Sequence, residues 1–153
     1  MDLLHRAREL YTAGRMHDAL EVAQAAADHA PKNAEAWALL GRVARFTGMP
    51  AASDLAFHRA AALTKRVPEP YRVQPDRFDQ LVDQARESLS PDARRRLERT
   101  TIRVQALPDL EEVRAGTDPD TLMARARGPQ DVLTLFQVNH ENRAGTEEAL
   151  RAL

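Results

Sequence analysis

The sequence predicts a mostly α protein of the α+β class, in which two helical hairpins are followed by a small α+β domain. Three observations lead to this prediction. The N-terminal residues match themselves after a shift of 34 positions, which places Gly14 on Gly48 and Ala26 on Ala60, and such self-similarity is typical of repeated helical hairpins. A proline-rich stretch then interrupts the helical pattern, and alternation of apolar and polar residues begins at Thr100.

The composition of the 153 residues narrows the class of protein. Hydrophobic residues make up 43% of the chain but aromatic residues only 5%, so the core must be built mainly from Leu, Ala and Val, which favours helices. The 22 basic and 23 acidic side chains give a net charge of −1, so no overall positive field attracts nucleic acid. Because cysteine is absent, disulfides, thiolate nucleophiles and cysteine-ligated metals are excluded.

The order of the segments predicts two domains, with helical hairpins over residues 1–66, a stiff linker over 67–75 and a mixed domain over 76–153. At the N-terminus no basic region precedes an apolar stretch, so we expect no secretory signal. No apolar run approaches the roughly 18 residues that a membrane helix needs. We therefore expect a cytoplasmic protein without a membrane partner.

Each of the two repeated segments reads as a pair of amphipathic helices joined at a glycine. The first segment runs from about Leu3 to His29, and Gly14 is expected to take the left-handed conformation that ends a helix. Small residues at helical spacing allow its second helix to approach its neighbours closely; they are Ala19, Ala23 and Ala26. Pro31 ends this segment, and Asn33 is expected to cap the next helix.

The second segment carries the residues of a known repeat. They are Trp37, Leu40, Gly41, Phe57, Ala60 and the preceding Pro31. In this pattern the chain resembles the tetratricopeptide repeat family, although it departs from the family at Leu3 and Arg6 in the first segment and at Ser53 and Lys65 in the second. Because about three repeats or a cap are needed for stability, we expect the helix after Thr64 to cover the open face.

The resemblance implies a binding groove lined by the first helix of each hairpin. The positions that would face this groove are His5, Arg8, Tyr11, Arg42, Arg45 and Phe46. Their guanidinium groups and aromatic rings would suit an acidic peptide or a C-terminal carboxylate as partner. The Asn and Lys side chains of the family's carboxylate clamp are absent here, which speaks against a true clamp, and the arginines are equally consistent with an ordinary solvated surface.

A different pattern follows the linker. A helix is expected from Pro75, with one apolar face formed by Phe78, Leu81, Val82, Ala85 and Leu89. Ser90 is expected to cap a shorter helix. Strands are expected at 101–106 and 132–136, and a final helix from Thr146. Short helices are expected around residues 116–119, and they are expected to include Leu110, Val113, Leu122 and Met123. Two strands alone do not form a stable sheet, so a further strand, a partner or a homodimer is required.

Four short segments of this second half carry another resemblance. They are residues 77–82, 89–91, 102–104 and 133–136, which are similar to the small zincin-like metallopeptidase family of bacteria. The family implies a zinc site formed by His-Glu-x-x-His on a helix, but here His140-Glu141 is followed by Ala144 where the second histidine should stand. We therefore expect no catalytic residue, no metal ligand and no cofactor, and the domain is either non-catalytic or a truncated piece of an enzyme.

The remaining polar residues predict no catalytic site. No two of the five histidines are three or four residues apart, so no helix presents a metal-binding pair, and we expect the histidines at the surface or at helix ends. The arginine run 94–96 lacks the interleaved aromatic residues of a nucleic-acid binder and is expected to be solvated. The sequence therefore favours a protein–protein interaction module or adaptor over an enzyme. The alternative is a zinc metallopeptidase whose metal-binding helix is missing or supplied by a partner.

Overall fold

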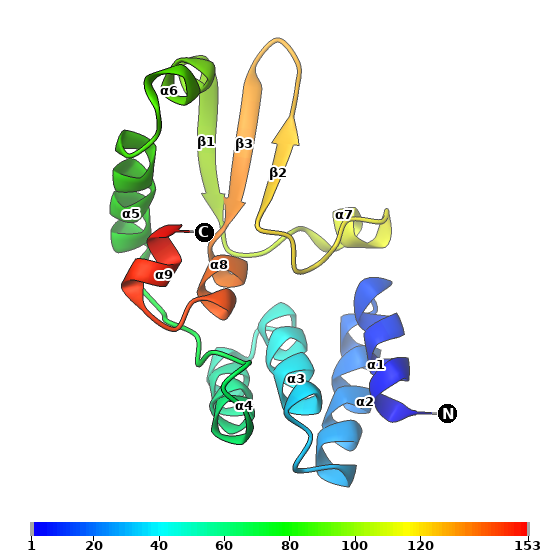
Figure 1. Ribbon diagram of the computed structural model, residues 1–153. Helices are drawn as coiled ribbons and strands as arrows, with labels where there is room; N and C mark the ends of the chain where they lie inside the picture. Colours follow the sequence, from blue (N-terminus) through cyan, green and yellow to red (C-terminus); the bar gives the residue numbers. More distant parts are fainter. Residues whose placement is uncertain (1, 153) are drawn as a thin grey trace. The chain divides into compact units, whose positions relative to one another are not determined.

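The computed structural model describes residues 2–152 and divides them into two compact units (Figure 1). The first unit comprises the residues up to Pro70 together with Pro108–Pro119. The second comprises Tyr71–Leu107 and the residues from Asp120 onward. The α+β class is confirmed, but the expected domain over 76–153 is interrupted, because a segment from its middle groups with the helical hairpins.

Two helical hairpins form most of the first unit. Their helices are α1 (Leu3–Thr12), α2 (Met16–His29), α3 (Ala34–Phe46) and α4 (Pro50–Leu63). Gly14 and Gly48 follow the first helix of each hairpin with φ angles of 77° and 74°, a conformation that glycine adopts at no steric cost. The Asn33 side chain accepts a hydrogen bond from the N–H of Glu35 at 3.0 Å, so it caps α3 as expected.

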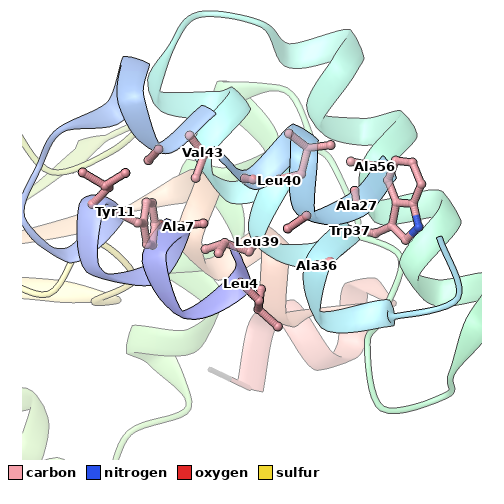
Figure 2. Close-up of a cluster of buried hydrophobic side chains, with 14 of the residues drawn as sticks. Leu4, Ala7, Tyr11, Ala27, Ala36, Trp37, Leu39, Leu40, Val43 and Ala56 are labelled. Atoms are coloured by element: carbon pink, nitrogen blue, oxygen red, sulfur yellow. The ribbon is translucent and has the colours of Figure 1, made fainter. Parts of the chain in front are cut away.

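Small residues allow the helices of this unit to pack closely (Figure 2). The alanine stripe expected on α2 is buried, and its members are Ala19, Ala23 and Ala26. Larger side chains such as Leu4 of α1 and Leu39 of α3 fill the space between the helices. The indole N–H of Trp37 donates to the carbonyl oxygen of Pro31 at 2.8 Å, which ties the start of α3 to the turn before it.

The closest approach of α3 to α4 lies at Gly41. A Cβ atom there would lie 2.7 Å from Cδ2 of Phe57, so a side chain at this position would require the helices to move apart. Ser53 is fully buried on α4, and its hydroxyl donates to the carbonyl oxygen of Gly41 at 2.6 Å. The serine that departs from the repeat pattern is therefore satisfied by a hydrogen bond inside the core.

A short helix from later in the chain, α7 (Leu110–Arg114), packs against the first hairpin. Its Val113 is 1% exposed and belongs to the core of the helical unit. At Gly14 an added Cβ would lie 2.7 Å from Cγ of Arg114, so the turn of the hairpin and α7 are in close contact. We expected the helix after Thr64 to complete this core, but that helix belongs to the second unit and residues 108–119 supply the extra surface.

The second unit combines short helices with a mixed sheet. Within the described residues its helices are α5 (Pro75–Glu87), α6 (Pro91–Leu97), α8 (Gln137–Arg143) and α9 (Glu147–Ala152). The strands are β1 (Thr100–Gln105), β2 (Met123–Ala126) and β3 (Asp131–Phe136). Strand β3 lies in the centre of the sheet, parallel to β1 and antiparallel to β2.

Strand β2 is the further strand that the sheet required. The short helix expected at Leu110 and Val113 is confirmed as α7. The helix expected at Leu122 and Met123 is wrong, because residues from Met123 onward pair with β3. Both expected strands are confirmed, and each begins one residue earlier than expected, at Thr100 and Asp131. Helix α8 was not predicted, and it starts at Gln137 directly after β3.

Helix caps and an ion pair fix the helices of the second unit. The N–H of Ala93 donates to the expected cap Ser90 at 3.2 Å. The N–H of Ala149 likewise donates to Thr146 at 3.1 Å. Arg77 on α5 forms an ion pair with Glu147 on α9, and this hydrogen bond lowers the pKa of the Glu147 carboxyl group.

The core of the second unit forms around α5. Phe78 and Leu81 are buried there with Ala144 and Leu150, which confirms the middle of the expected apolar face. Leu89 was expected on the same face but lies beyond the end of α5 and is 37% exposed.

The contact at Gly41 predicts a specific loss of stability. Gly41→Ala should lower the free energy of unfolding by about 1–3 kcal/mol, because the added methyl group displaces the Phe57 ring. Trp37 is the single tryptophan, so its fluorescence during urea unfolding reports on the helical unit. Gly128→Ala adds the same methyl group where the nearest atom is 3.9 Å away and should leave the curve unchanged. An unchanged midpoint in Gly41→Ala would show that the contact is not tight.

Candidate functional site

The residues expected to line a groove along α1 and α3 differ in exposure, and several of them are paired or buried. His5 and Arg8 are exposed on α1, but each has a carboxylate partner within the unit. The Nε2 atom of His5 lies 3.3 Å from Glu9, and Nη2 of Arg8 lies 2.5 Å from Glu35 on α3. Such exposed pairs contribute about 0–1 kcal/mol, but they leave little unbalanced positive charge for an acidic peptide.

The aromatic residues of the expected groove are packed together. Tyr11 is only 3% exposed, and its ring meets that of Phe46 edge-on with centroids 5.8 Å apart. The guanidinium carbon of Arg42 lies 5.9 Å from the Tyr11 centroid, which is within cation–π distance. Arg42, Arg45 and Phe46 are half-buried. The burial of Tyr11 corrects its expected position on an open groove, because the ring is needed to fill the space between α1 and α3.

An open apolar groove lies instead between α2 and α4, with α3 as its floor. It has a volume of about 370 Å³. Leu20 of α2, Trp37 and Leu40 of α3, and Ala52 and Leu55 of α4 are among the residues that line it. Its walls are therefore the second helices of the two hairpins, whereas the family resemblance pointed to the first helices.

The α4 wall of this groove leaves large apolar side chains in solvent. Leu55 is 54% exposed and Met49, just before the helix, is 45% exposed. On its other face α4 buries Phe57 and Ala60 in the core. A helix that is apolar on two faces has more apolar surface than its own unit covers, which is typical of a contact with another molecule.

The two rims of the groove carry opposite charges. Glu21 belongs to the α2 rim and Arg59 to the α4 rim. The guanidinium carbon of Arg59 lies 4.7 Å from the centroid of the Trp37 ring, so the cation stacks on the indole of the floor. Within residues 2–152 neither Glu21 nor Arg59 has a recorded ion pair. Both charges are therefore available to a bound molecule.

The sequence contained a signal for this groove. Successive residues of a helix are about 100° apart, so Leu55 falls on the side of α4 opposite Phe57 and Ala60. A second apolar stripe beside the expected inner face could have indicated an exposed binding surface. The repeat resemblance directed attention to α1 and α3 instead.

His140 lies in the last turn of α8, at a helix end as expected, but its side chain is buried inside the second unit. It is 4% exposed, and its Nδ1 atom lies 2.9 Å from the carbonyl oxygen of Phe136. Because a carbonyl oxygen only accepts, Nδ1 must carry the proton and donate it. Burial lowers the pKa of the His140 imidazole, and the hydrogen bond to Phe136 opposes this shift only in part. The ring is therefore held in its neutral form.

Glu141 is occupied by structural hydrogen bonds. It is 2% exposed and accepts from the N–H of Val73 at 2.9 Å, from Nη1 of Arg72 at 3.3 Å and from Nε2 of Gln137 at 3.1 Å. These bonds join the segment before α5 to α8. The carboxylate of the His140-Glu141 pair is thus committed to holding the fold together.

Three further features of the chain bear on its candidate site, namely metal-binding groups, membrane-spanning helices and similarity to known proteins. Within residues 2–152 no group of three or more His, Cys, Asp or Glu side chains could hold a metal ion. In the same part of the chain, no helix is long and apolar enough to cross a membrane. No family model, no curated protein and no solved structure matches the chain. The groove over Trp37, with its exposed apolar wall, is the candidate site.

The buried imidazole predicts a pH-dependent stability. Below about pH 6.5 the unfolded chain binds a proton at this histidine, whereas the folded chain resists protonation of His140. The unfolded state then binds more protons, so stability should fall as the pH falls from about 6.5 towards the lowered pKa of the folded state. His140→Gln should flatten this dependence between pH 7.5 and 5.5 in urea unfolding followed by circular dichroism. The exposed His17, changed to Gln, should leave it intact; equal profiles for both variants would contradict the assignment.

The hydrogen bonds of Glu141 predict a local effect at Val73. Glu141→Ala removes the acceptor from a buried amide and a partly buried guanidinium, and should cost about 3 kcal/mol. Hydrogen exchange of the Val73 amide should become about 100-fold faster. Glu148→Ala, at an exposed position of α9, is the matched control and should leave this exchange rate unchanged. Unaltered protection in Glu141→Ala would mean that the carboxylate does not hold this segment.

Proposed function

We propose that the chain is a protein-interaction module or adaptor that holds a partner in the groove over Trp37. The observation that carries this proposal is the exposed apolar surface of α4, with Leu55 54% exposed beside an apolar hollow of about 370 Å³. The hollow is large enough for several apolar side chains. Burying them would release water from both surfaces at about 25 cal/mol per Å², which is the usual driving force of protein association.

The repeat character of the helical unit supports this role. Each hairpin turns at a glycine with the same left-handed conformation, Gly14 and Gly48. The second hairpin has the close Gly41–Phe57 contact that the tetratricopeptide pattern requires of a small residue in one helix and a large one in the next. We infer that the unit is a pair of tetratricopeptide-type repeats, and proteins built in this way commonly present extended surfaces to other proteins.

The second unit has a structural role in this proposal. We infer that its resemblance to zincin-like metallopeptidases extends only to the order of helices and strands. Glu141 is used to hold Arg72 and Val73, and His140 donates to a backbone carbonyl. Both residues of the one candidate metal motif are thus engaged in internal contacts, which favours a non-catalytic scaffold.

Site-specific crosslinking tests the proposed surface. The chain has no cysteine, so Leu55→Cys provides a single attachment point for a benzophenone crosslinker at the wall of the groove. Leu3→Cys, at a leucine that is 38% exposed on α1, is the matched control. The labelled full-length chain is irradiated in an extract of its own cells, and covalent products are separated by mass.

The expected result is a discrete crosslinked species from position 55 that is absent from position 3. An excess of unlabelled wild-type chain should suppress it, whereas an excess of Leu55→Arg chain should not, because arginine blocks the hollow. Products of equal amount from both positions, or no product at position 55, would contradict a protein-binding role for this groove.

A further inference from the structure

The α4 helix provides both halves of a self-complementary contact. Ala52 and Leu55 form one wall of the hollow, and Leu55 together with Met49 projects exposed apolar side chains into solvent. Leu63 lies about two turns further along α4, rotated by about 80° from Leu55, and is also exposed, at 42%. To bind a different molecule, the surface would need only the hollow, because the other molecule would supply the side chains that fill it. A surface that pairs with itself needs a hollow and side chains that fill a hollow, and α4 carries both.

The charged residues of the groove are also self-complementary. Glu21 lies on the α2 rim and Arg59 on the α4 rim, and no ion pair is recorded for either in the described part of the chain. A two-fold axis that sets α4 of one copy over α2 of another brings each Arg59 towards the other copy's Glu21. The contact is then made twice, with opposite charges each time. Two parallel rims of like charge would instead repel a second copy.

The stacking of Arg59 on Trp37 prepares this contact. With its guanidinium carbon 4.7 Å from the ring centroid, the planar cation lies on the indole and need not be ordered again on binding. Its edge, which carries the N–H donors, remains available to a carboxylate. Arginine is among the residue types that most often contribute strongly to the energy of an interface.

We propose that the groove over Trp37 binds a second copy of this chain, so that the protein is a two-fold symmetric dimer through α2 and α4. The proposal rests on the protein-binding role of the groove and specifies its partner. In the dimer Leu55 of each copy enters the hollow of the other, and two Glu21–Arg59 ion pairs close the rims. The α1–α3 face lies outside this contact.

Sedimentation velocity of the full-length chain between 1 and 100 µM tests the dimer. The wild-type chain should sediment with twice the mass of one chain at the higher concentrations. Leu55→Arg and Ala52→Arg change exposed residues and should keep the fold, as checked by circular dichroism and Trp37 fluorescence, but should sediment as monomers. Leu3→Arg, at a similarly exposed leucine outside the groove, should remain dimeric. A wild-type chain that stays monomeric at 100 µM overturns the proposal.

Charge reversal shows whether the contact joins two copies in the proposed arrangement. Glu21→Arg or Arg59→Glu alone should weaken dimerisation at least tenfold, because each homodimer then contains two pairs of like charge. An equimolar mixture of the two variants should regain wild-type affinity, because both pairs in the mixed dimer again join opposite charges. Failure of the mixture to exceed either variant alone contradicts the arrangement.

The crosslink from position 55 separates this inference from the proposed function. A product with the mass of two chains supports the dimer. A product with a different protein, from a chain that is monomeric in sedimentation, leaves the protein-binding role standing and overturns the dimer. The absence of any specific product overturns both.

Discussion

Helices α3 and α4 pack closely because residue 41 has no side chain. The Phe57 ring occupies the space that a Cβ atom at Gly41 would take, and the carbonyl oxygen of the same residue receives the hydroxyl of Ser53. With this face of α4 fixed against α3, the opposite face must point outward, and it carries Leu55 and Arg59. The α4 wall of the groove and its positive rim thus depend on one glycine in the helix that forms the floor.

The hairpins could be predicted because their signals are local. Glycines with φ near 75°, the Asn33 cap and the buried alanines of α2 depend on residues a few positions apart, and a 34-residue repeat adds a second copy of each signal. The candidate site was less predictable. Whether Tyr11 faces a groove or fills a core depends on the distance between α1 and α3, which periodicity does not determine.

In the second unit, some elements and contacts could not be predicted from local sequence patterns. Strand β1 alternates apolar and polar residues and β3 has an apolar run, so both were predicted. Met123–Ala126 is a short edge strand with too few residues to show a pattern, and pairing with β3 decides its state. His140 and Glu141 resemble a fragment of a metal motif in sequence. Their partners, Phe136 in one case and Val73 in the other, lie four and 68 residues away, and the longer separation could not be read from the chain.

The docking of α7 on the first hairpin affects the order in which the chain can be assembled. Val113 completes a core whose other members lie before residue 61, so the chain must close a long loop to form this contact, at an entropic cost that grows slowly with loop length. During synthesis on the ribosome, the hairpins emerge first, and part of their apolar surface stays exposed to solvent until residues 108–119 have been made. A break at the proline-rich segment would likewise separate the hairpins from α7. The core of the first unit is therefore complete only after residues 108–119 have been synthesised and have packed against the hairpins.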